Sequence, residues 1–435
     1  MNDESMREFI SRMVHEYYRE FHAQEPFVPG TTHVPVTQKY YDSAEMNAIV
    51  SSALDFNLTS GRFVESFEKK LSTYVGTRYA LTTNSGSSAN LLAVLSASES
   101  QNDADEPRQV ITMAAGFPTT VAPIYQAGMI PHFVDITLPT YSVNVDQVNE
   151  AVNHHTVGMI LAHTLGNPFD LDSILAICEE HGLWLVEDCC DALGSEYYGR
   201  KVGSFGRAST LSFYPAHQIT CGEGGAVLLN DPRLARVVES YRDWGRDCWC
   251  ETGHDATCGK RYTQQFGTLP FGYDHKYVYT RLGYNLKMTE MQAAIGDGQM
   301  DKLDWFVTIR RKHFAQLLAG LGKYEGYFIL PEETSGATTS WFGFPLTIRR
   351  TAPFNRPGII DYLDRARIDS RLLFAGNMTR QPVLEGAMYV AEDLAVSDKI
   401  MNDTFWLGVH PSLTTEMIDY MIETIDCFIK ETQQK

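Results

Sequence analysis

Apolar positions along most of this chain follow two periods in turn. Short apolar runs, which predict buried strands, are separated by stretches in which apolar residues recur at helical spacing. The predicted strands are residues 110–113, 132–136, 157–162, 183–186, 210–213 and 226–229. Short buried strands that alternate with helices indicate an α/β fold, with a mainly parallel sheet flanked by helices on both faces.

The two ends of the chain differ from this middle part. Residues 7–21 have a helical pattern and lead into residues 26–35, whose Pro and Gly predict an extended arm. A long helical stretch at 289–321 then precedes isolated strand candidates at 327–330 and 342–348. We predict three parts: an N-terminal helix and arm (1–35), a large cofactor-binding domain (36–300) and a smaller C-terminal α+β domain (301–435).

Composition narrows the class of partner. The chain has 435 residues, of which 44% are hydrophobic, enough for a large core. A net charge of −18 argues against nucleic acid or an anionic membrane as the main partner. We find no apolar run of about 18 residues and no signal peptide, so we expect a cytoplasmic protein.

A Gly/Ser turn, Ser85-Gly86-Ser87-Ser88, runs directly into an Ala/Leu-rich helical stretch. Free backbone N–H groups and hydroxyls there meet the positive end of a helix dipole, which is the chemistry of a phosphate site. The alternative for this segment alone is an ordinary serine N-cap. Further along, the strand at 183–188 ends in Asp188, where a carboxylate could pair with a ligand cation such as a pyridinium nitrogen, or could merely cap a helix.

Cysteines cluster in a second place. Cys248, Cys250 and Cys258 lie within a polar loop, residues 243–261, which we call the cysteine loop. Three thiolates are one short of a four-thiolate site. Cys190 is the best fourth candidate, because it lies two residues beyond Asp188 and would point to the same side of an extended chain. The spacing leaves a zinc site, an iron–sulfur cluster and free thiols open.

Several segments together resemble the sugar-aminotransferase branch of the fold-type I vitamin-B6 enzymes, whose fold is like that of aspartate aminotransferase. The matching segments are residues 84–89, 115–120, 187–188, 212–213 and 282–285. The resemblance implies that Gly86, Ser87, Ser88 and Ser212 hold the cofactor phosphate, Phe117 stacks on its ring, and Asp188 pairs with the ring nitrogen. It also implies that Asn285 reaches the phosphate in a neighbouring subunit, and hence a homodimer with shared active sites.

Three positions depart from the aminotransferase pattern. His217 stands where the family has the lysine that binds the cofactor covalently, Asp191 replaces the usual His or Gln, and Tyr214 stands where His is common. Histidine can transfer protons but cannot form the covalent tether. We therefore expect pyridoxamine 5′-phosphate (PMP) rather than covalently held pyridoxal phosphate (PLP), with His217, Asp191 and Tyr214 as the catalytic residues.

The cysteine spacing adds a closer resemblance. In the sequence, 57 residues separate Cys190 from Cys248, one separates Cys248 from Cys250, and seven separate Cys250 from Cys258. This is similar to the pattern of the [2Fe-2S] 3-dehydrases of nucleotide-linked 4-keto-6-deoxyhexoses, which also have histidine in place of the lysine. The resemblance implies that these four cysteines are the ligands of a [2Fe-2S] cluster.

The activity that this resemblance implies is removal of the C3 hydroxyl from a nucleoside-diphosphate 4-keto-6-deoxyhexose. The PMP amine would condense with the C4 ketone, His217 would remove the C4′ proton, and the hydroxyl would leave. The cluster would then pass in electrons from an NAD(P)H-dependent flavin or iron–sulfur reductase. Arg371 and Arg380 are candidates for binding the substrate, or else form surface ion pairs.

Three other functions remain as alternatives. A cluster-free PMP dehydratase would release ammonia and a keto-deoxy sugar, and the three cysteines of the loop argue against it. A sugar aminotransferase would need the lysine that this chain lacks. A non-catalytic metal or iron–sulfur sensor on a retired enzyme scaffold would leave the phosphate site, Asp188 and His217 without a common purpose.

Overall fold

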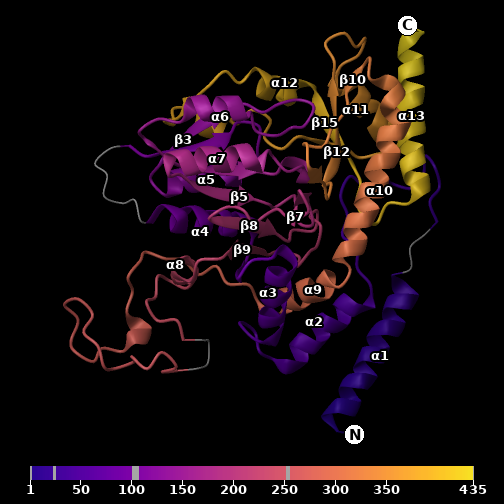
Figure 1. The fold of residues 1–435 in the computed structure, drawn as a ribbon. Coiled ribbons are helices and arrows are strands. Elements are labelled where there is room, and N and C mark those ends of the chain that lie inside the picture. The colour runs from indigo at the N-terminus through magenta and orange to yellow at the C-terminus, as the bar shows by residue number, and fades with distance from the viewer. Residues whose placement is uncertain (1, 23–25, 100–106, 251–254, 435) are drawn as a thin grey trace.

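The computed structural model describes residues 2–22, 26–99, 107–250 and 255–434 (Figure 1). An eight-stranded sheet forms the centre of its larger part. Its strands, in spatial order, are β1 (Tyr79–Thr83), β9 (Gly225–Leu229), β8 (Ala208–Ser212), β5 (Trp184–Asp188), β4 (Thr156–Ala162), β2 (Gln109–Met113), β3 (Ile130–Val134) and β14 (Val390–Ala391). Only β9 runs antiparallel to its neighbours, so the sheet is mainly parallel.

Both faces of this sheet are buried, as the continuous apolar runs predict. In β4, Met159 and Leu161 pack into one hydrophobic cluster while Ile160 between them packs into another, because successive strand residues point to opposite faces. One face is covered by α4 (Gly86–Ser98), α5 (Pro118–Gln126) and α8 (Pro232–Arg242). The other is covered by α3 (Arg62–Val75), α6 (Val145–Ala151), α7 (Leu171–His181) and α9 (Glu290–Met300).

The C-terminal part builds a second core around an antiparallel sheet. Its strands are β10 (Phe328–Ile329), β12 (Gly343–Ile348), β15 (Thr404–Gly408) and β13 (Arg371–Leu372). The associated helices are α10 (Leu303–Leu321), α11 (Arg356–Arg365), α12 (Ala395–Asp403) and α13 (Thr415–Gln433). A small third sheet joins β6 (Glu196–Tyr197), β7 (Arg200–Lys201) and β11 (Ala337–Thr338).

The six predicted strands all form, and the α/β class with helices on both faces is confirmed. The prediction of one long helix at 289–321 was wrong in one respect: two helices form, α9 and α10, with a break at Asp301 and Lys302. There Lys302 Nζ lies 2.6 Å from Glu45 Oε1, which ties the break to α2 (Ser43–Asp55). The predicted domain boundaries stay a prediction, and β14, from the C-terminal part, adds a strand to the large sheet.

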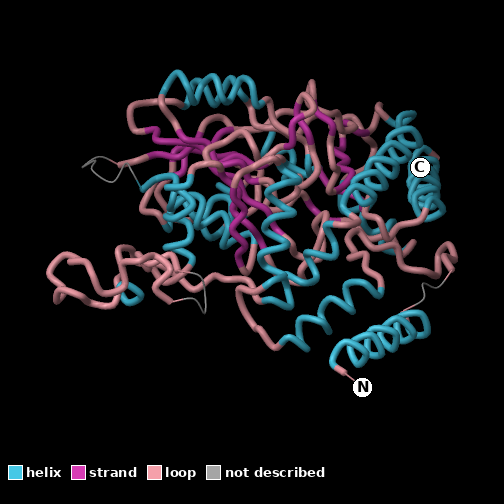
Figure 2. Tube along the Cα trace, turned by 60° about the horizontal axis from the view of Figure 1, so that its bottom comes forward, coloured by secondary structure: helices cyan, strands magenta, loops and turns pink. Residues whose placement is uncertain are grey.

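Two segments lie at the outside of the molecule. Helix α1 (Asp3–Phe21) lies beside α2. Residues 243–250 and 255–289, the described parts of the connection between α8 and α9, reach out from the body (Figures 1 and 2). The predicted arm crosses the C-terminal part of its own chain, where Val34 bridges to Ile368. None of the helices in the described ranges is long and apolar enough to cross a membrane.

Candidate functional site

A cavity of about 520 Å³ opens where strands β4, β5 and β8 end. Ala162, Asp188 and Ser212, the last residues of these strands, all line it. The carboxyl ends of parallel strands are the usual place for a ligand crevice in such sheets. We call this cavity the strand-end pocket; residues from the C-terminal part complete its wall, namely Phe342, Arg371, Leu372, Phe374 and Trp406.

The phosphate end of the pocket is the first turn of α4. Ser85 caps the helix, its side chain accepting a hydrogen bond from the Ser88 backbone N–H, and Ser87 lines the pocket. Gly86 is required by packing, because a Cβ there would lie 2.7 Å from Ser212 Oγ and closer still to Ser212 Cβ. The Ser88 hydroxyl instead donates to Asn84 Oδ1 at 2.7 Å, so its side chain supports the turn.

Asp188 is held firmly in the wall of the pocket. Its carboxylate is buried, and Oδ2 accepts hydrogen bonds from Asn90 Nδ2 at 2.9 Å and from Thr120 Oγ1 at 2.7 Å. Oδ1 accepts one from the Cys190 backbone N–H at 3.1 Å. Three donors fix the orientation of this carboxylate, which suits a group that must meet a ring nitrogen.

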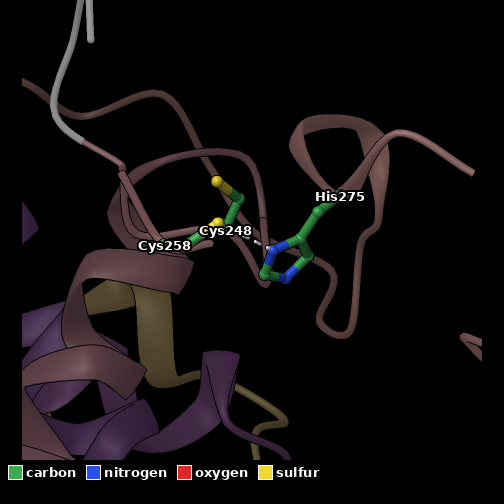
Figure 3. Close-up of side chains that lie close together, drawn as sticks. All are labelled: Cys248, Cys258 and His275. Atoms are coloured by element: carbon green, nitrogen blue, oxygen red, sulfur yellow. Dashed lines mark hydrogen bonds between the residues drawn. The ribbon is translucent and has the colours of Figure 1, made fainter. Parts of the chain in front are cut away.

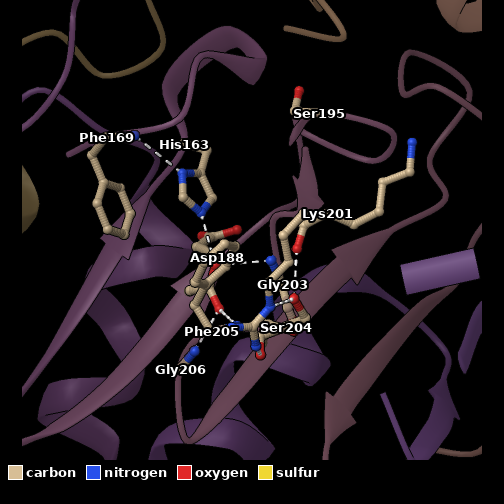
Figure 4. A network of polar contacts seen from close by, with 12 residues as sticks. His163, Phe169, Asp188, Ser195, Lys201, Gly203, Ser204, Phe205 and Gly206 are labelled. Carbon is tan, nitrogen blue, oxygen red and sulfur yellow. Dashed lines mark hydrogen bonds and ion pairs between the residues drawn. The ribbon is translucent and has the colours of Figure 1, made fainter. Parts of the chain in front are cut away.

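A buried hydrogen-bond network around Glu187 supports the end of strand β5 (Figure 4). Glu187 is fully buried, and its carboxylate accepts backbone hydrogen bonds from Gly203, Phe205 and Gly206 at 2.7–2.8 Å. His163 Nε2 lies 3.2 Å from Glu187 Oε2. Burial opposes ionisation, but His163 and the backbone donors outweigh it and lower the pKa of Glu187. The network therefore anchors the residue next to Asp188.

His217 lies in the pocket beside Asp191. Its Nδ1 is 3.6 Å from Asp191 Oδ1 and has no hydrogen-bond partner among the described residues. Burial, followed by the nearby Arg310 charge, lowers the pKa of His217 to about 4, while burial and then Asp188 raise the pKa of Asp191 to about 8. At neutral pH the imidazole is therefore uncharged and able to accept a proton.

Arg310 on α10 holds the backbone of the His217 turn. It is 1% exposed and donates to the carbonyl oxygens of His217 at 3.0 Å, Trp341 at 3.2 Å and Phe342 at 3.3 Å. Burial lowers the pKa of Arg310 to about 10, so it remains a cation at neutral pH. One side chain thus joins the His217 turn to the C-terminal part.

Phe117 and Tyr214 stand at the mouth of the pocket, each about half exposed. The Phe117 ring meets Phe374 edge-on, with ring centres 5.9 Å apart. An open aromatic face, an anion-binding helix end and a fixed carboxylate match the ring, phosphate and ring nitrogen of a vitamin-B6 cofactor. The residues present therefore fit this cofactor, and the role expected of each residue stays a prediction.

The two predicted substrate arginines are separated. Arg371 lines the strand-end pocket. Arg380 faces a different surface cavity and forms an ion pair with Asp398, with an N–O distance of 2.8 Å. Asn285 lies outside the pocket lining of its own chain, in a short bridge with Asp243.

The four predicted cysteine ligands also fall into two groups. Cys190 lines the strand-end pocket, whereas Cys248, Cys250 and Cys258 lie in the α8–α9 connection. Ligand atoms of Cys248 and Cys258 lie within 4.8 Å of one another and of His275 (Figure 3). Within the described ranges, Cys190 is not part of this cluster. Residues 251–254 of the cysteine loop lie outside the described residues.

Sequence reasoning missed four residues of these sites. Asn90 and Thr120 hold Asp188, Arg310 holds the His217 turn, and His275 joins the cysteines. Asn90 follows Gly86 by four residues on a helix, a spacing that places it on the same face as the phosphate turn. No comparable signal in the sequence points to Arg310, which comes from a distant helix.

Comparisons with known proteins extend these observations. Residues 39–426 match the model of the DegT/DnrJ/EryC1/StrS aminotransferase family. The lipopolysaccharide biosynthesis protein RfbH of Salmonella typhimurium is 48% identical over 98% of this chain and 99% of its own. The dTDP-4-dehydro-2,6-dideoxy-D-glucose 3-dehydratase of Saccharopolyspora spinosa is 45% identical over 97% and 92%.

A solved structure shares the fold over 90% of this chain. That structure is E. coli GDP-4-keto-6-deoxy-D-mannose-3-dehydratase with bound hydrated PLP, which is 26% identical with a TM-score of 0.81 over 90% of this chain and 98% of its own. Because the family model covers most of the chain and the relatives match nearly its full length, the protein belongs to the DegT/DnrJ/EryC1/StrS aminotransferase family.

Proposed function

We propose that this protein is a PMP-dependent dehydrase that removes the C3 hydroxyl of a nucleoside-diphosphate 4-keto-6-deoxyhexose. The observation that carries the proposal is the strand-end pocket itself. It contains His217 and the anchored Asp188, and no lysine is among its lining residues in the described part of the chain. Relatives named as 3-dehydratases of nucleotide-linked keto-sugars, at 45% and 30% identity, support the substrate class.

PMP supplies an amine that condenses with a ketone and an aromatic ring that draws electrons away from the adjacent carbon. The turn of Gly86 and Ser87, with Ser212, would bind its phosphate, and Asp188 would keep its ring nitrogen protonated. His217 would take the proton from the carbon that bears the amine. Asp191, whose carboxyl is protonated at neutral pH, would orient the imidazole without adding a charge.

Removal of a hydroxyl as water, with no change elsewhere, requires two electrons and two protons. Cys248, Cys250 and Cys258 would hold an iron–sulfur centre, which passes electrons singly. A flavin or iron–sulfur reductase that oxidises NAD(P)H would be the external donor. The sequence-based assignment of Cys190 as the fourth ligand stays a prediction, since Cys190 lies in the pocket and not beside the loop cysteines.

A homodimer with shared active sites is part of the proposal. Large apolar side chains lie exposed on α1 and on the α8–α9 connection, where contact with a second copy would cover them. They include Phe9, Met13, Phe21, Phe271 and Leu282. Leu282 is 96% exposed and lies three residues from Asn285, the residue expected to reach the neighbouring subunit.

The proposal can be tested in two steps, the first of which needs no reductase. PMP deuterated at the carbon that bears the amine is incubated with protein and substrate, and loss of deuterium to water is followed by mass spectrometry. We expect exchange with the wild type and at least a hundredfold slower exchange with His217→Asn, because asparagine cannot accept the proton. A tightly bound PMP in both proteins, shown by its absorbance, is the control.

The second step identifies the product with dithionite or a reductase present. The proposal expects a 3-deoxy-4-keto sugar nucleotide, formed only when electrons are supplied. An amino sugar would make the protein an aminotransferase instead. Ammonia release with a keto-deoxy product and no need for a reductant would favour the cluster-free dehydratase. That second candidate is favoured by one observation, the separation of Cys190 from the loop cysteines.

A further inference from the structure

Two groups of residues line the strand-end pocket, and they come from different parts of the chain. The side chains proposed for PMP, which include Ser87, Asp188 and Ser212, belong to the large sheet and its helices. The second group belongs to the C-terminal part and to the chain just after the N-terminal arm. We call it the outer wall; its residues are Thr37, Phe342, Arg371, Leu372, Phe374 and Trp406. Since the first group is assigned to PMP, we assign the sugar of the substrate to the outer wall.

The outer wall is mostly apolar and offers few partners to a sugar hydroxyl. Its two Phe side chains and its Leu side chain have no polar atom. Trp406 Nε1 donates to Leu372 O at 3.0 Å, so this N–H is already paired. Arg371 is a cation, which suits the diphosphate of the substrate. Within the described ranges, Thr37 is therefore the one uncharged side chain of the outer wall that can still hydrogen-bond a sugar.

The backbone is held on both sides of Thr37. His410 Nε2 donates to Pro35 O at 3.0 Å, two residues before it. Ser412 Oγ donates to Lys39 O at 3.2 Å, two residues after it. Side chains from the C-terminal part thus fix the path of this segment past the pocket, as a binding residue requires.

Packing holds the same segment between the two hydrophobic cores. Val34 is buried in the core of the C-terminal part, and Val36 is buried in the core beside the large sheet. A Cβ at Gly408 would lie 2.5 Å from Val36 O, so the end of β15 approaches this backbone closely. Thr37 is consequently presented to the pocket where the two parts of the molecule meet.

The Thr37 hydroxyl is free to bind a ligand. It forms no hydrogen bond with any residue that the structure describes. A threonine hydroxyl can both donate and accept, so it can pair with a hydroxyl in either sense. The family model begins at residue 39, so Thr37 lies outside the segment that the family shares.

Only one hydroxyl of the proposed sugar remains through the reaction. C1 carries the diphosphate, C3 loses its hydroxyl, C4 condenses with the PMP amine, and C6 is a methyl carbon. The C2 hydroxyl remains, and it lies next to the diphosphate end of the sugar. Arg371, the candidate for the diphosphate, belongs to the same wall as Thr37.

We propose that Thr37 binds the C2 hydroxyl, so that the protein selects a 4-keto-6-deoxyhexose that retains this hydroxyl over a 2,6-dideoxy sugar. The inference rests on the substrate class of the proposed function and narrows it. A C2 hydroxyl that leaves water gains a partner in Thr37. A 2-deoxy sugar leaves the Thr37 hydroxyl unpaired, and a site built to pair a hydroxyl rejects the analogue that lacks it.

The test measures binding of sugar nucleotides that cannot react, because they have a hydroxyl in place of the C4 ketone. The probes are 6-deoxyglucose and 2,6-dideoxyglucose, each linked to CDP and to dTDP. Calorimetry gives the Kd of each probe for the full-length, PMP-loaded protein. The variants are Thr37→Val, which removes the hydroxyl at nearly constant volume, and Thr37→Ser, which keeps it. Thr31→Val is the control, because Thr31 is exposed on the same arm and outside the pocket lining.

With the nucleotide that binds more tightly, we expect the wild type to bind the 2-hydroxy sugar about tenfold more tightly than the 2-deoxy sugar. Thr37→Ser and Thr31→Val should keep this preference, whereas Thr37→Val should bind the two sugars within about twofold of each other. In the reaction with the 4-keto sugars, Thr37→Val should raise KM for the 2-hydroxy substrate and leave kcat nearly unchanged, because C2 does not react.

Other outcomes separate the inference from the proposed function. Equal affinity for both sugars in the wild type, tighter binding of the 2-deoxy sugar, or a preference that persists in Thr37→Val overturns the inference. These results leave the proposed function intact, since it depends on the product formed from the 4-keto sugar. If the preference depends on Thr37 but the product is an amino sugar, the inference stands and the proposed function fails. No binding of any of the four probes overturns both.

Discussion

At the scale of single residues, the chemistry of His217 depends on its surroundings more than on its type. An ordinary histidine is half protonated near pH 6.5, whereas burial and the Arg310 charge lower the pKa of His217 to about 4. Its Nδ1 faces Asp191 without a hydrogen bond. The imidazole is therefore uncharged over a wider pH range than an exposed histidine, and its lowered pKa also makes it a weaker base.

The first prediction concerns pH. His217 must be uncharged to accept a proton, and with a lowered pKa it stays uncharged until the pH approaches 4. We therefore expect kcat/KM, or the rate of deuterium loss from labelled PMP, to fall only below about pH 5. A decline centred near pH 6.5 would mean that the folded protein leaves the histidine in an ordinary environment.

The second prediction concerns Arg310. Substitution Arg310→Gln removes the charge that opposes protonation of His217, so the acidic limb of the pH profile should move up toward 6.5, the ordinary pKa. The lost hydrogen bonds to buried carbonyls should also lower the free energy of unfolding by about 1–3 kcal/mol. The matched control is Arg311→Gln, since Arg311 also donates to backbone carbonyls, those of Thr338 and Thr339. An unchanged pH profile in Arg310→Gln would contradict the assignment.

At the scale of elements, the proposed cofactor site lies where the first turn of α4 packs against the end of β8. The absence of a side chain at Gly86 allows the helix end to approach Ser212 closely. The helix then presents its free N–H groups at the mouth of the strand-end pocket. Gly86 is therefore needed here for packing, in addition to the phosphate binding that we propose for this turn.

The third prediction follows from this close contact between α4 and β8. Gly86→Ala places a methyl group against Ser212 and should weaken PMP binding by roughly tenfold or more, about 1.4 kcal/mol. A titration monitored by cofactor absorbance measures this change. Gly322→Ala serves as the control, because a Cβ at that helix end meets nothing within 4 Å. Equal affinity in Gly86→Ala and wild type would show that the turn does not carry the phosphate.

At the scale of the whole molecule, one chain supplies most of the strand-end pocket but leaves apolar side chains exposed on its outer segments. The strand-end pocket is lined by both the central sheet and the C-terminal part, while Asn285 stays outside it. The α8–α9 connection presents exposed aromatic side chains to solvent. A second copy that covers them would also bring Asn285 to the neighbouring pocket, as the homodimer proposal requires.

The fourth prediction tests that sharing. His217→Asn and Asn285→Ala proteins should each be nearly inactive alone, because every site in either homodimer lacks one of the two residues. After the two are mixed and allowed to exchange subunits, mixed dimers contain one site with both residues, so activity should return in part. Light scattering gives the oligomeric state. Two inactive variants that stay inactive in a demonstrated mixed dimer would place Asn285 and His217 in sites that are not shared.

Much of this protein is determined by short stretches of its sequence. Alternation of apolar runs with helical periodicity predicted six strands of the large sheet and its class. Strands β1 and β14 of the same sheet were not predicted, and β14 consists of only two residues, both exposed. The motif residues do gather in one pocket, because each ends or follows a strand that ends at the same edge of the sheet; they are Gly86, Ser87, Asp188, Ser212 and His217.

The sequence by itself determined the α/β class and showed His217 at the position of the lysine, because both signals come from residues that are close together in the chain. Only the tertiary structure decided which partners tune those residues. Asn90 and Asp188 are 98 positions apart, and Arg310 and His217 are 93 apart. His275 likewise joins Cys258 across 17 positions of irregular chain. Hydrogen bonds and charges act over a few ångströms in space, so no periodicity along the chain reveals them.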